Sequence, residues 1–483
     1  MMKKTITVVL LALLSWPLNL IMATEIALPE IGDSAGALIS PQQEYRIGQS
    51  FYWRIQQSTD LIDDPEVNRY LQSVGYRLVA ESASPHLSFT FFMVPASSVN
   101  AFAAPGGFIG THSGLVLASE SEDELASVLA HEIAHVTQRH LLRGFEKQKN
   151  LSVPFTAATI AAALLVAVNP KAGSAALMAV QAGGVQMQID NTRAHEKEAD
   201  NLGMQNLVRS GFDAHAMPSF FERLQRESRF YTGNAVPEFL RTHPVTTNRI
   251  AEARGRAATY PLQRQLSDHL QFYLIREKLR VMTVNNIGDL SQLYAETLKT
   301  GNSLNLTATR YGYSLALLKL GEYTKARQQL QILIDEDNDR LSYQLALAEI
   351  EIAVGRLPVA LAIYEEDQRL YPDDQALSLM QVKALLKANL PEQAIKILHR
   401  QLELGNPSQV LYQQLAQAES ALGHKSQSHS WLAEYYYSAG RITQATDQLR
   451  LAAKFAERDE YLLAKITARL REIELTLALM EEI

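Results

Sequence analysis

The chain has 483 residues, of which 47% are hydrophobic and 20% are charged, and its formal net charge is −7. It is too long for one typical domain, so at least two are expected. Nucleic-acid binding requires basic surfaces, and this acidic balance argues against it. The sequence contains no cysteine, which excludes disulfides and any lipid anchor attached through cysteine.

The first 23 residues read as a targeting segment. Two lysines precede an apolar run from Thr5 to Met22, and Ala23 supplies a small residue before a cleavage site. This is the pattern of a secretory signal peptide, and Pro17 and Asn19 interrupt the run, which argues against a retained membrane anchor. We predict cleavage after residue 23, a mature chain with a net charge of −9, and export to a bacterial cell envelope.

Extended segments follow further along the chain. Ser88 to Pro95 is apolar and aromatic and predicts a strand, Pro105-Gly106-Gly107 predicts a turn, and Phe108-Ile109-Gly110 resumes extended structure. We expect a hairpin beside the helix that comes next. Its edge could pair with an extended substrate, although an ordinary core hairpin explains the pattern equally well.

The most informative segment is His131-Glu132-Ile133-Ala134-His135, an HExxH sequence. Ser121 and Glu124 have the spacing of a capping box, which predicts that a helix begins there and runs through the motif. Residues i and i+4 share a helix face, so His131 and His135 can bind one metal ion together. Neutral imidazole suits zinc, and Glu132 is placed to act as the general base toward a zinc-activated water.

A third protein ligand must come from elsewhere in the chain. The metzincin pattern needs Gly and His at the third and sixth positions after the second histidine, where this chain has Gln138 and Leu141, so that class is excluded. His140 is five positions after His135 and therefore out of step with it on a helix. We interpret His140 as a surface residue.

A long apolar stretch comes before the second candidate segment. Residues 153–168 are almost wholly apolar, Asn169-Pro170-Lys171 breaks the run, and residues 172–187 are rich in small side chains. Each piece is shorter than the roughly 20 residues that span a bilayer. We predict a helical hairpin, which packs on the core, lines a substrate cavity or makes a peripheral membrane contact.

The third ligand is predicted in the charged run that follows this stretch. Glu196 and Asp200 are four residues apart, so one helix face carries both. Glu196 would complete a His2Glu zinc site, and Asp200 would accept a hydrogen bond from a ligand imidazole. His195 and Glu198 are competing ligands on other faces, and a solvated charged face is the alternative to any metal role.

HEIAH followed by EKEAD resembles the gluzincin zinc-peptidase family that contains the CaaX prenyl protease and the HtpX heat-shock protease. The stretch from Asn100 to Gly110 and the segment from Gly114 to Leu117 are similar to the part of that family that precedes the metal helix. The similar motifs lie between about Asn100 and Arg249. The resemblance implies a zinc metalloendopeptidase with one Zn²⁺ per chain.

In this family the segment around Arg241-Thr242-His243-Pro244 lies near the metal. Proline disfavours helix at the residue before it, so His243 is expected on a loop. Two active roles are open for His243, namely stabilising the oxyanion of the tetrahedral intermediate or occupying the open zinc position in a latent enzyme. A structural loop histidine is the alternative. Arg249 is expected to bind substrate backbone or to brace the loop.

A 34-residue period begins after about Leu262. Gly321, Gly355 and Gly423 mark it, and Asn389 stands where one glycine is missing. Alanine follows five residues after three of these markers, at Ala326, Ala360 and Ala394, while Ser428 stands at the fourth. Helix–turn–helix units of this length are tetratricopeptide repeats. Gly440 and Ala445 repeat the spacing half a period out of phase, which predicts an irregular or capping end.

The predicted architecture is α+β and mainly helical: a signal peptide (1–23), a gluzincin metallopeptidase domain with a small β-sheet (24–261) and an all-α tetratricopeptide-repeat solenoid (262–483). This order is similar to that of periplasmic quality-control proteases of Gram-negative bacteria. The resemblance implies chaperone-like activity as well as proteolysis. It also implies three kinds of partner, namely misassembled outer-membrane proteins, the barrel assembly machinery and the lipopolysaccharide-transport barrel. The alternative function is a repeat-based chaperone or adaptor with a latent or structural metal site.

Overall fold

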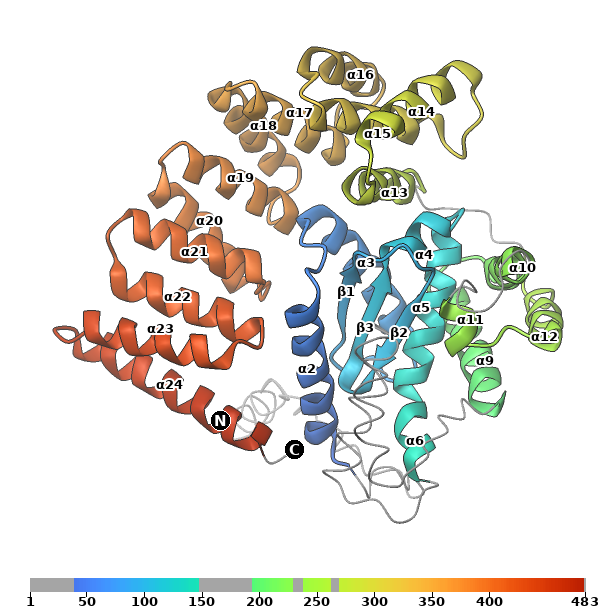
Figure 1. The fold of residues 1–483 in the computed structure, drawn as a ribbon, viewed down its shortest axis with the longest axis horizontal. Coiled ribbons are helices and arrows are strands. Elements are labelled where there is room, and N and C mark those ends of the chain that lie inside the picture. The colour runs from blue at the N-terminus through green and yellow to red at the C-terminus, as the bar shows by residue number, and fades with distance from the viewer. Residues whose placement is uncertain (1–38, 147–192, 229–237, 262–268, 482–483) are drawn as a thin grey trace, which may run out of the picture.

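The computed structural model describes residues 39–146, 193–228, 238–261 and 269–481. Within these ranges the chain is mainly helical with one three-stranded sheet, which confirms the predicted fold class (Figure 1). The predicted signal peptide and the apolar segment 153–187 lie outside the described residues. No helix in the described ranges has both the length and the apolarity needed to cross a bilayer.

The sheet has the strand order β1-β3-β2, so the last strand in sequence lies in the centre. β3 (Phe108–His112) pairs antiparallel with β2 (Ala101–Ala104) across the short 3-10 turn η2 (Pro105–Gly107). It pairs parallel with β1 (Thr90–Val94) on its other side. The predicted hairpin is therefore wrong in one respect, because its first strand is β2 rather than the aromatic segment. The aromatic strand reaches β3 through a crossover, which residue periodicity does not reveal.

Both faces of the sheet are buried, and the alternation of side chains along β1 shows how. Phe91 and Met93 pack into the main core with α3 (Pro65–Ala80) and α5 (Glu122–Thr137), while Phe92 and Val94 face α2 (Pro41–Ser58). Successive strand residues point to opposite faces, so an almost continuous apolar run is what a doubly covered strand requires. The sheet therefore holds one side of the HExxH helix α5 in the core.

The remaining helices of the first half follow this core. They are α4 (Ser113–Ala118), α6 (His140–Glu146), α9 (Arg193–Arg209), α10 (Ala216–Ser228), α11 (Glu238–Thr242) and α12 (Thr247–Ala257). α9 packs directly on α5. The contact is close at Gly203, where an added Cβ would lie 3.1 Å from the backbone nitrogen of His131. A glycine there lets the two helices that carry the predicted metal ligands approach each other.

Helix α5 begins where the sequence predicts, although the cap differs in one detail. Ser121 Oγ accepts the backbone N–H of Glu124 at 3.2 Å, which is half of a capping box. The Glu124 carboxylate does not return to Ser121. It accepts from the backbone of Glu120 at 2.7 Å and forms an ion pair with Arg223 of α10. A long-range cation has therefore replaced the local reciprocal bond.

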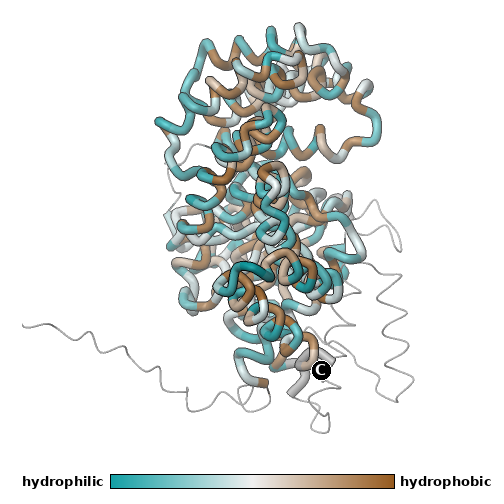
Figure 2. Tube along the Cα trace, turned by 90° about the vertical axis from the view of Figure 1, so that its left-hand side faces the viewer, coloured by the Kyte–Doolittle hydropathy of each residue, from teal (hydrophilic) through white to brown (hydrophobic). Residues whose placement is uncertain are grey.

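The second half is an arc of antiparallel helices, which in Figure 1 runs from α13 at the upper right, over the top, and down the left side to α24. Its members are α13 (Leu270–Thr283), α14 (Ile287–Thr300), α15 (Leu306–Lys319), α16 (Tyr323–Glu336), α17 (Leu341–Ala353), α18 (Leu357–Leu370), α19 (Gln375–Lys387), α20 (Pro391–Glu403), α21 (Gln409–Ala421), α22 (Lys425–Ser438), α23 (Ile442–Phe455) and α24 (Glu460–Glu481). Hydrophobic and hydrophilic residues alternate along these helices (Figure 2), as expected for stacked amphipathic pairs.

The repeat markers lie at the turns inside the helix pairs. Gly321, Gly355, Asn389 and Gly423 all have positive φ, with values of 78°, 81°, 58° and 78°. Glycine adopts this left-handed conformation without a steric penalty and asparagine tolerates it, which explains why Asn389 can replace a glycine. The alanines at 326, 360 and 394 are fully buried between helices. The boundary that we predict between residues 261 and 262 stays a prediction.

The arc curves around the first half and contacts it at both ends, and between them α19 packs on α3. At the far end Trp53 of α2 donates from its indole nitrogen to the carbonyl of Ser438 at 3.1 Å and packs with α23 and α24. At the near end Lys278 of α13 is buried and lies 2.8 Å from Glu66 and 2.9 Å from Asp64, at the start of α3. The array is therefore fixed to α2 and α3.

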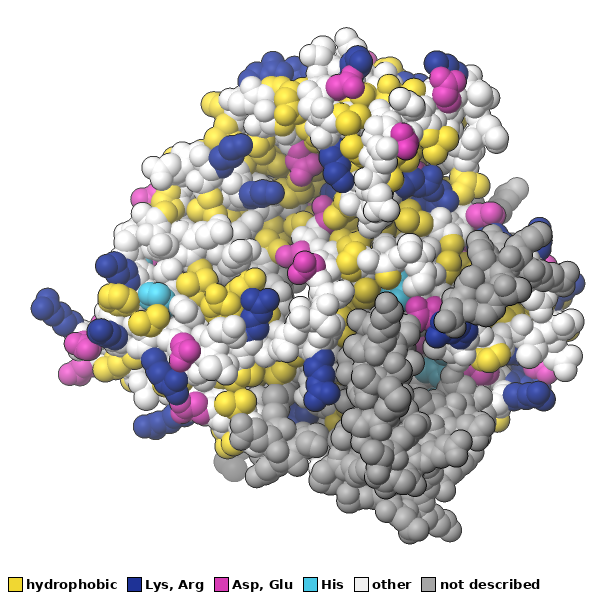
Figure 3. Space-filling view, viewed as in Figure 1, with side chains coloured by type: hydrophobic (Ala, Val, Ile, Leu, Met, Phe, Trp, Pro, Cys, Tyr) yellow, Lys and Arg dark blue, Asp and Glu magenta, His cyan; other side chains and the backbone are white. Residues whose placement is uncertain are grey.

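Beside the contact of α13 with α3, the inner helices of the array leave a cavity of about 970 Å³. The start of α3 and helices α13, α15, α17, α19 and α21 line it. Figure 3 shows hydrophobic side chains along the hollow of the arc, with charged groups between them.

Candidate metal centre

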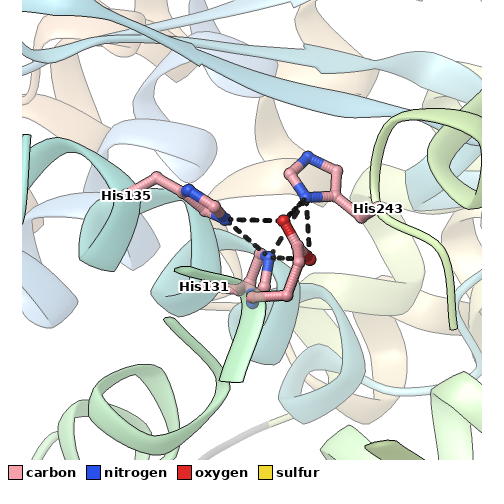
Figure 4. A group of neighbouring side chains, drawn as sticks. His131, His135 and His243 are labelled. Carbon is pink, nitrogen blue, oxygen red and sulfur yellow. Dashed lines mark hydrogen bonds and ion pairs between the residues drawn. The ribbon is translucent and has the colours of Figure 1, made fainter. Parts of the chain in front are cut away.

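Four side chains from three separate segments meet at one point. His131 and His135 come from α5, Glu196 from the first turn of α9, and His243 from the residue that follows α11. Each offers one ligand atom, and these atoms all lie within 4.8 Å of one another (Figure 4). The structure thus brings together the three predicted zinc ligands and adds His243 to them.

Several separations between these atoms are close to those expected around a tetrahedral metal ion. Ligands about 2.0–2.1 Å from zinc in a tetrahedron are roughly 3.3 Å apart. The Nε2 atoms of the two α5 histidines are 3.0 Å apart, and each lies 3.5 Å from a carboxylate oxygen of Glu196. The Nδ1 of His243 lies 3.3 Å from His131 Nε2 and 3.1 Å from Glu196 Oε1. Two or three imidazoles with one carboxylate form a donor set that suits zinc.

Asp200 lies behind His131, one helical turn after Glu196. Its Oδ1 is 3.0 Å from His131 Nδ1, the ring nitrogen that faces away from the cluster. This is the outer position in which a carboxylate fixes the tautomer of a metal-ligating histidine. The side chain of Asp200 is 1% exposed, so the carboxylate needs further partners.

Arg249 supplies those partners. Its guanidinium donates two hydrogen bonds of 2.8 Å to Asp200, lies 2.8 Å from Glu196 Oε2 and donates to the carbonyl of Pro244 at 3.0 Å. Of the two roles expected for Arg249, this geometry fits bracing of the His243 loop. Arg249 is itself buried, so the geometry offers little room for contact with a substrate backbone.

The electrostatics of the cluster favour a cation. Burial alone disfavours protonated His131, but hydrogen bonds to Asp200 and Glu196 outweigh burial and raise the pKa of His131 to about 10. Burial likewise disfavours ionised Glu196, yet His243 and His131 lower the pKa of this carboxyl well below its usual range. Burial and the neighbouring His131 lower the pKa of His135. The negative charge that favours a proton on His131 would equally favour a metal ion.

Glu132 lies beside the cluster and is 1% exposed. Its Oε1 is buried and makes no hydrogen bond to the described residues, while His243 Nε2 lies 3.4 Å away. A buried carboxylate oxygen without a donor is costly, so this oxygen keeps acceptor capacity for a water molecule or a substrate group.

The expectation that His140 is a surface residue is wrong. His140 is 4% exposed, and its Nδ1 lies 3.0 Å from Nδ1 of His135. Helix α5 ends at Thr137, and Arg139 has a φ of 51°, so the helical periodicity used for the prediction does not continue to His140. Burial lowers the pKa of His140 to about 4, despite the nearby Glu198.

His195 and Glu198, the two other candidates for the third metal ligand, lie beside His140. His195 stacks on His140 with ring centroids 4.6 Å apart, and Glu198 lies 3.1 Å from His140 Nε2. Neither belongs to the four-residue cluster.

His243 is held at its place by short contacts. The residue follows α11 and precedes Pro244, as the loop expectation requires. Its backbone nitrogen donates to Phe239 at 2.7 Å, and Phe239 donates to Val99 beside the sheet at 3.0 Å. Ser98 also donates to Glu238 at 3.2 Å. The loop that carries His243 is therefore attached to the connection between β1 and β2.

An HExxH helix with a glutamate from a second helix defines a metallopeptidase. The model of peptidase family M48 matches residues 65–257. Over 92% of its length the chain is 35% identical to the beta-barrel assembly-enhancing protease of Escherichia coli K12, of which it covers 91%. It is 36% identical to the Vibrio cholerae counterpart over 93% of this chain and 92% of that protein.

The chain therefore belongs to the beta-barrel assembly-enhancing proteases, a group of M48 metalloendopeptidases. A more distant similarity, 28% identity over 41% of this chain and 56% of the relative, links it to the mitochondrial metalloendopeptidase OMA1 of Schizosaccharomyces pombe. Among solved structures, the Cut9–Hcn1 assembly of the APC/C covers 73% of this chain and 77% of its own, at 13% identity. The TM-score of this similarity is 0.24.

Proposed function

We propose that this protein is a zinc-dependent endopeptidase whose zinc is held by His131, His135 and Glu196. The observation that supports this most directly is the convergence of these ligand atoms within 4.8 Å, beside a buried carboxylate oxygen of Glu132 that lacks a hydrogen bond from the described residues. A purely structural metal site would not require a carboxylate at the position of Glu132.

The residues divide the chemistry among them. When bound, zinc would lower the pKa of a coordinated water to about 7 and polarise the scissile carbonyl. Glu132 takes the proton of the attacking water and passes it to the leaving amine. Asp200 keeps His131 in the tautomer whose Nε2 faces the cluster, and Arg249 keeps Glu196 and Asp200 in place.

For His243 we propose a latent resting state. Its Nδ1 lies among the ligand atoms, 3.1 Å from Glu196 Oε1, where an open zinc site would leave room for water. Oxyanion stabilisation requires the ring to face the substrate carbonyl instead. The loop after α11 would then have to move before His243 could serve that purpose.

The first test is metal content and casein cleavage of the purified mature protein beside Glu132→Gln. The amide has the shape of the carboxylate but cannot take a proton, so the variant should bind about one zinc per chain and lose cleavage. Zinc without cleavage in either protein supports latency. Absence of zinc from the wild-type protein would contradict the proposed zinc site.

His243→Ala separates the two roles of this histidine. Latency predicts faster casein cleavage because the fourth position becomes available, whereas oxyanion stabilisation predicts slower cleavage. An unchanged rate would contradict both roles. The double variant Glu132→Gln/His243→Ala is the matched control, since any gain that survives in it comes from a contaminating protease.

We further propose that the protein works in the periplasm, after removal of residues 1–23, on misassembled outer-membrane proteins. The Escherichia coli and Vibrio cholerae relatives are named for beta-barrel assembly, which supports outer-membrane barrel proteins as substrates. The barrel assembly machinery and the lipopolysaccharide-transport barrel stay predictions from the family resemblance. The cavity of about 970 Å³ inside the array is lined by apolar and charged side chains and is large enough to hold a partner segment. Peripheral contact with a membrane stays a prediction.

The alternative is a repeat-based chaperone or adaptor whose metal site is latent or structural. The position of His243 among the ligands favours this alternative more than an open site would. Complementation of a strain that lacks the gene decides between them. Full biological activity of Glu132→Gln would favour the chaperone, and loss of activity with retained partner binding would favour the peptidase.

A further inference from the structure

The two metal-facing histidines of α5 differ in what lies behind them. His131 presents its outer nitrogen, Nδ1, to the carboxylate of Asp200 at 3.0 Å. His135 presents its outer nitrogen to another histidine, because its Nδ1 lies 3.0 Å from Nδ1 of His140. Metal-ligating histidines usually donate their second N–H to a partner that fixes the ring, and for His135 the geometry places His140 in that position.

The hydrogen bonds along this line have one consistent direction. When the Nε2 of His135 serves as a metal ligand, its proton must be on Nδ1, which then donates to Nδ1 of His140. His140 accepts there and carries its own proton on Nε2, which lies 3.1 Å from Glu198 Oε2. Arg143 donates to the same carboxylate oxygen at 3.2 Å. Each nitrogen and oxygen atom along this line of hydrogen bonds is thus either a donor or an acceptor, without conflict.

The backbone turn between α5 and α6 brings His140 into contact with His135. Arg139 adopts a φ of 51°, a left-handed conformation that non-glycine residues rarely take. Its side chain donates at 3.0 Å to Glu44 Oε2 of α2 and at 3.0 Å to the carbonyl of Ile39, just before that helix. This turn returns His140 toward the preceding helix, where the ring is sandwiched between His135 and a parallel ring of His195 at 4.6 Å.

His135 is the ligand that needs outside support. It lies in the last turn of α5, and its side chain is 11% exposed, compared with 1% for His131 in the body of the helix. Less of its orientation is therefore set by packing against the core. We propose that His140 is a positioning residue that fixes the ring and the tautomer of His135, with Glu198 holding His140 in turn.

This inference rests on the proposed zinc site, so its test measures zinc affinity rather than proteolysis. The zinc dissociation constant of the full mature chain is measured by competition with a chromophoric chelator, for wild type, His140→Ala and His140→Asn. Loss of an outer partner typically weakens metal binding 10–100-fold, and we expect a change of about that size for His140→Ala. The asparagine oxygen takes nearly the place of Nδ1, so His140→Asn should stay within a few-fold of wild type.

Leu142→Ala provides a matched control. Leu142 lies on the same short helix and is 4% exposed in the core cluster with α2, so its truncation loosens α6 without removing a bond to His135. We expect it to lower thermal stability and leave the zinc dissociation constant unchanged.

Three results would overturn the inference. The first is a wild-type zinc dissociation constant in His140→Ala. The second is zinc binding that is weakened equally in His140→Asn and His140→Ala. The third is zinc binding that is weakened as much in Leu142→Ala as in His140→Ala. A wild-type protein that binds no zinc would instead overturn the proposed function and this inference with it.

Discussion

Replacing Arg249 with leucine should destabilise the metal-free protein severely. The guanidinium is the described cation nearest to two buried carboxylates, with side-chain exposures of 3% for Glu196 and 1% for Asp200. It makes three contacts of 2.8 Å to them and one of 3.0 Å to the carbonyl of Pro244. Removing one partner of a buried ion pair costs about 3–5 kcal/mol. In the metal-free protein His131, whose pKa is raised to about 10, still offsets part of the negative charge, so we expect the lower end of that range.

Zinc should reduce this loss. A bound cation neutralises Glu196 directly, so in the loaded protein the substitution leaves mainly Asp200 in need of a partner, and His131 still lies 3.0 Å from it. We therefore expect a smaller difference between Arg249→Leu and wild type with zinc than with chelator. Arg249→Lys keeps the charge but loses the bidentate geometry, so it should recover only part of the stability.

The assay is urea unfolding with chelator and with zinc, followed by hydrogen exchange at the amides of α9 and α12. Exchange is needed because the two halves of the chain need not unfold as one cooperative unit. Arg254→Leu on the same helix is the matched control, since its side chain is 68% exposed and its surface ion pair should contribute about 0–1 kcal/mol. If chelator-treated Arg249→Leu unfolds within about 1 kcal/mol of wild type, the buried-charge argument is wrong.

Three further outcomes are expected. Gly440→Ala should detach the end of the array from α2, because its Cβ would lie 2.3 Å from Trp53 at a φ of 70°; limited proteolysis should then cut α23 and α24 faster, and an unchanged pattern would refute the contact. Acid should destabilise the protein through His112, whose folded pKa burial lowers from 6.5 to about 4. The folded state disfavours its protonation, so stability present above pH 6.5 falls between 6.5 and 4 by up to about 3 kcal/mol; His112→Asn should flatten the pH profile, and an equally steep profile would exclude His112. Removing zinc with a chelator should lower the unfolding free energy by about 3 kcal/mol relative to zinc at 100 times its dissociation constant, and equal melting curves would show that no metal binds the native state.

Several features were decided by the sequence because they depend on neighbouring residues. The i, i+4 spacing places His131 and His135 on one face of any helix, whatever surrounds it. The 34-residue period and its turn residues likewise act within single repeats, and Asn389 shows this because a left-handed turn needs only a residue that tolerates positive φ. The fold class followed from these local patterns.

Only the tertiary structure decided which distant groups meet. The parallel pairing of β1 with β3 depends on a crossover, and the contact of His140 with His135 depends on a turn at Arg139 that α2 stabilises through side-chain bonds. Helical periodicity was a poor guide at His140 because the helix ends before it. Three other contacts join segments that are far apart in the chain. They are the bonds of Arg249 to Glu196 and Asp200, the position of His243 among the ligands, and the attachment of the array to α2 and α3. Such contacts are set by packing and charge compensation across the core, which spacing along a single sequence does not encode.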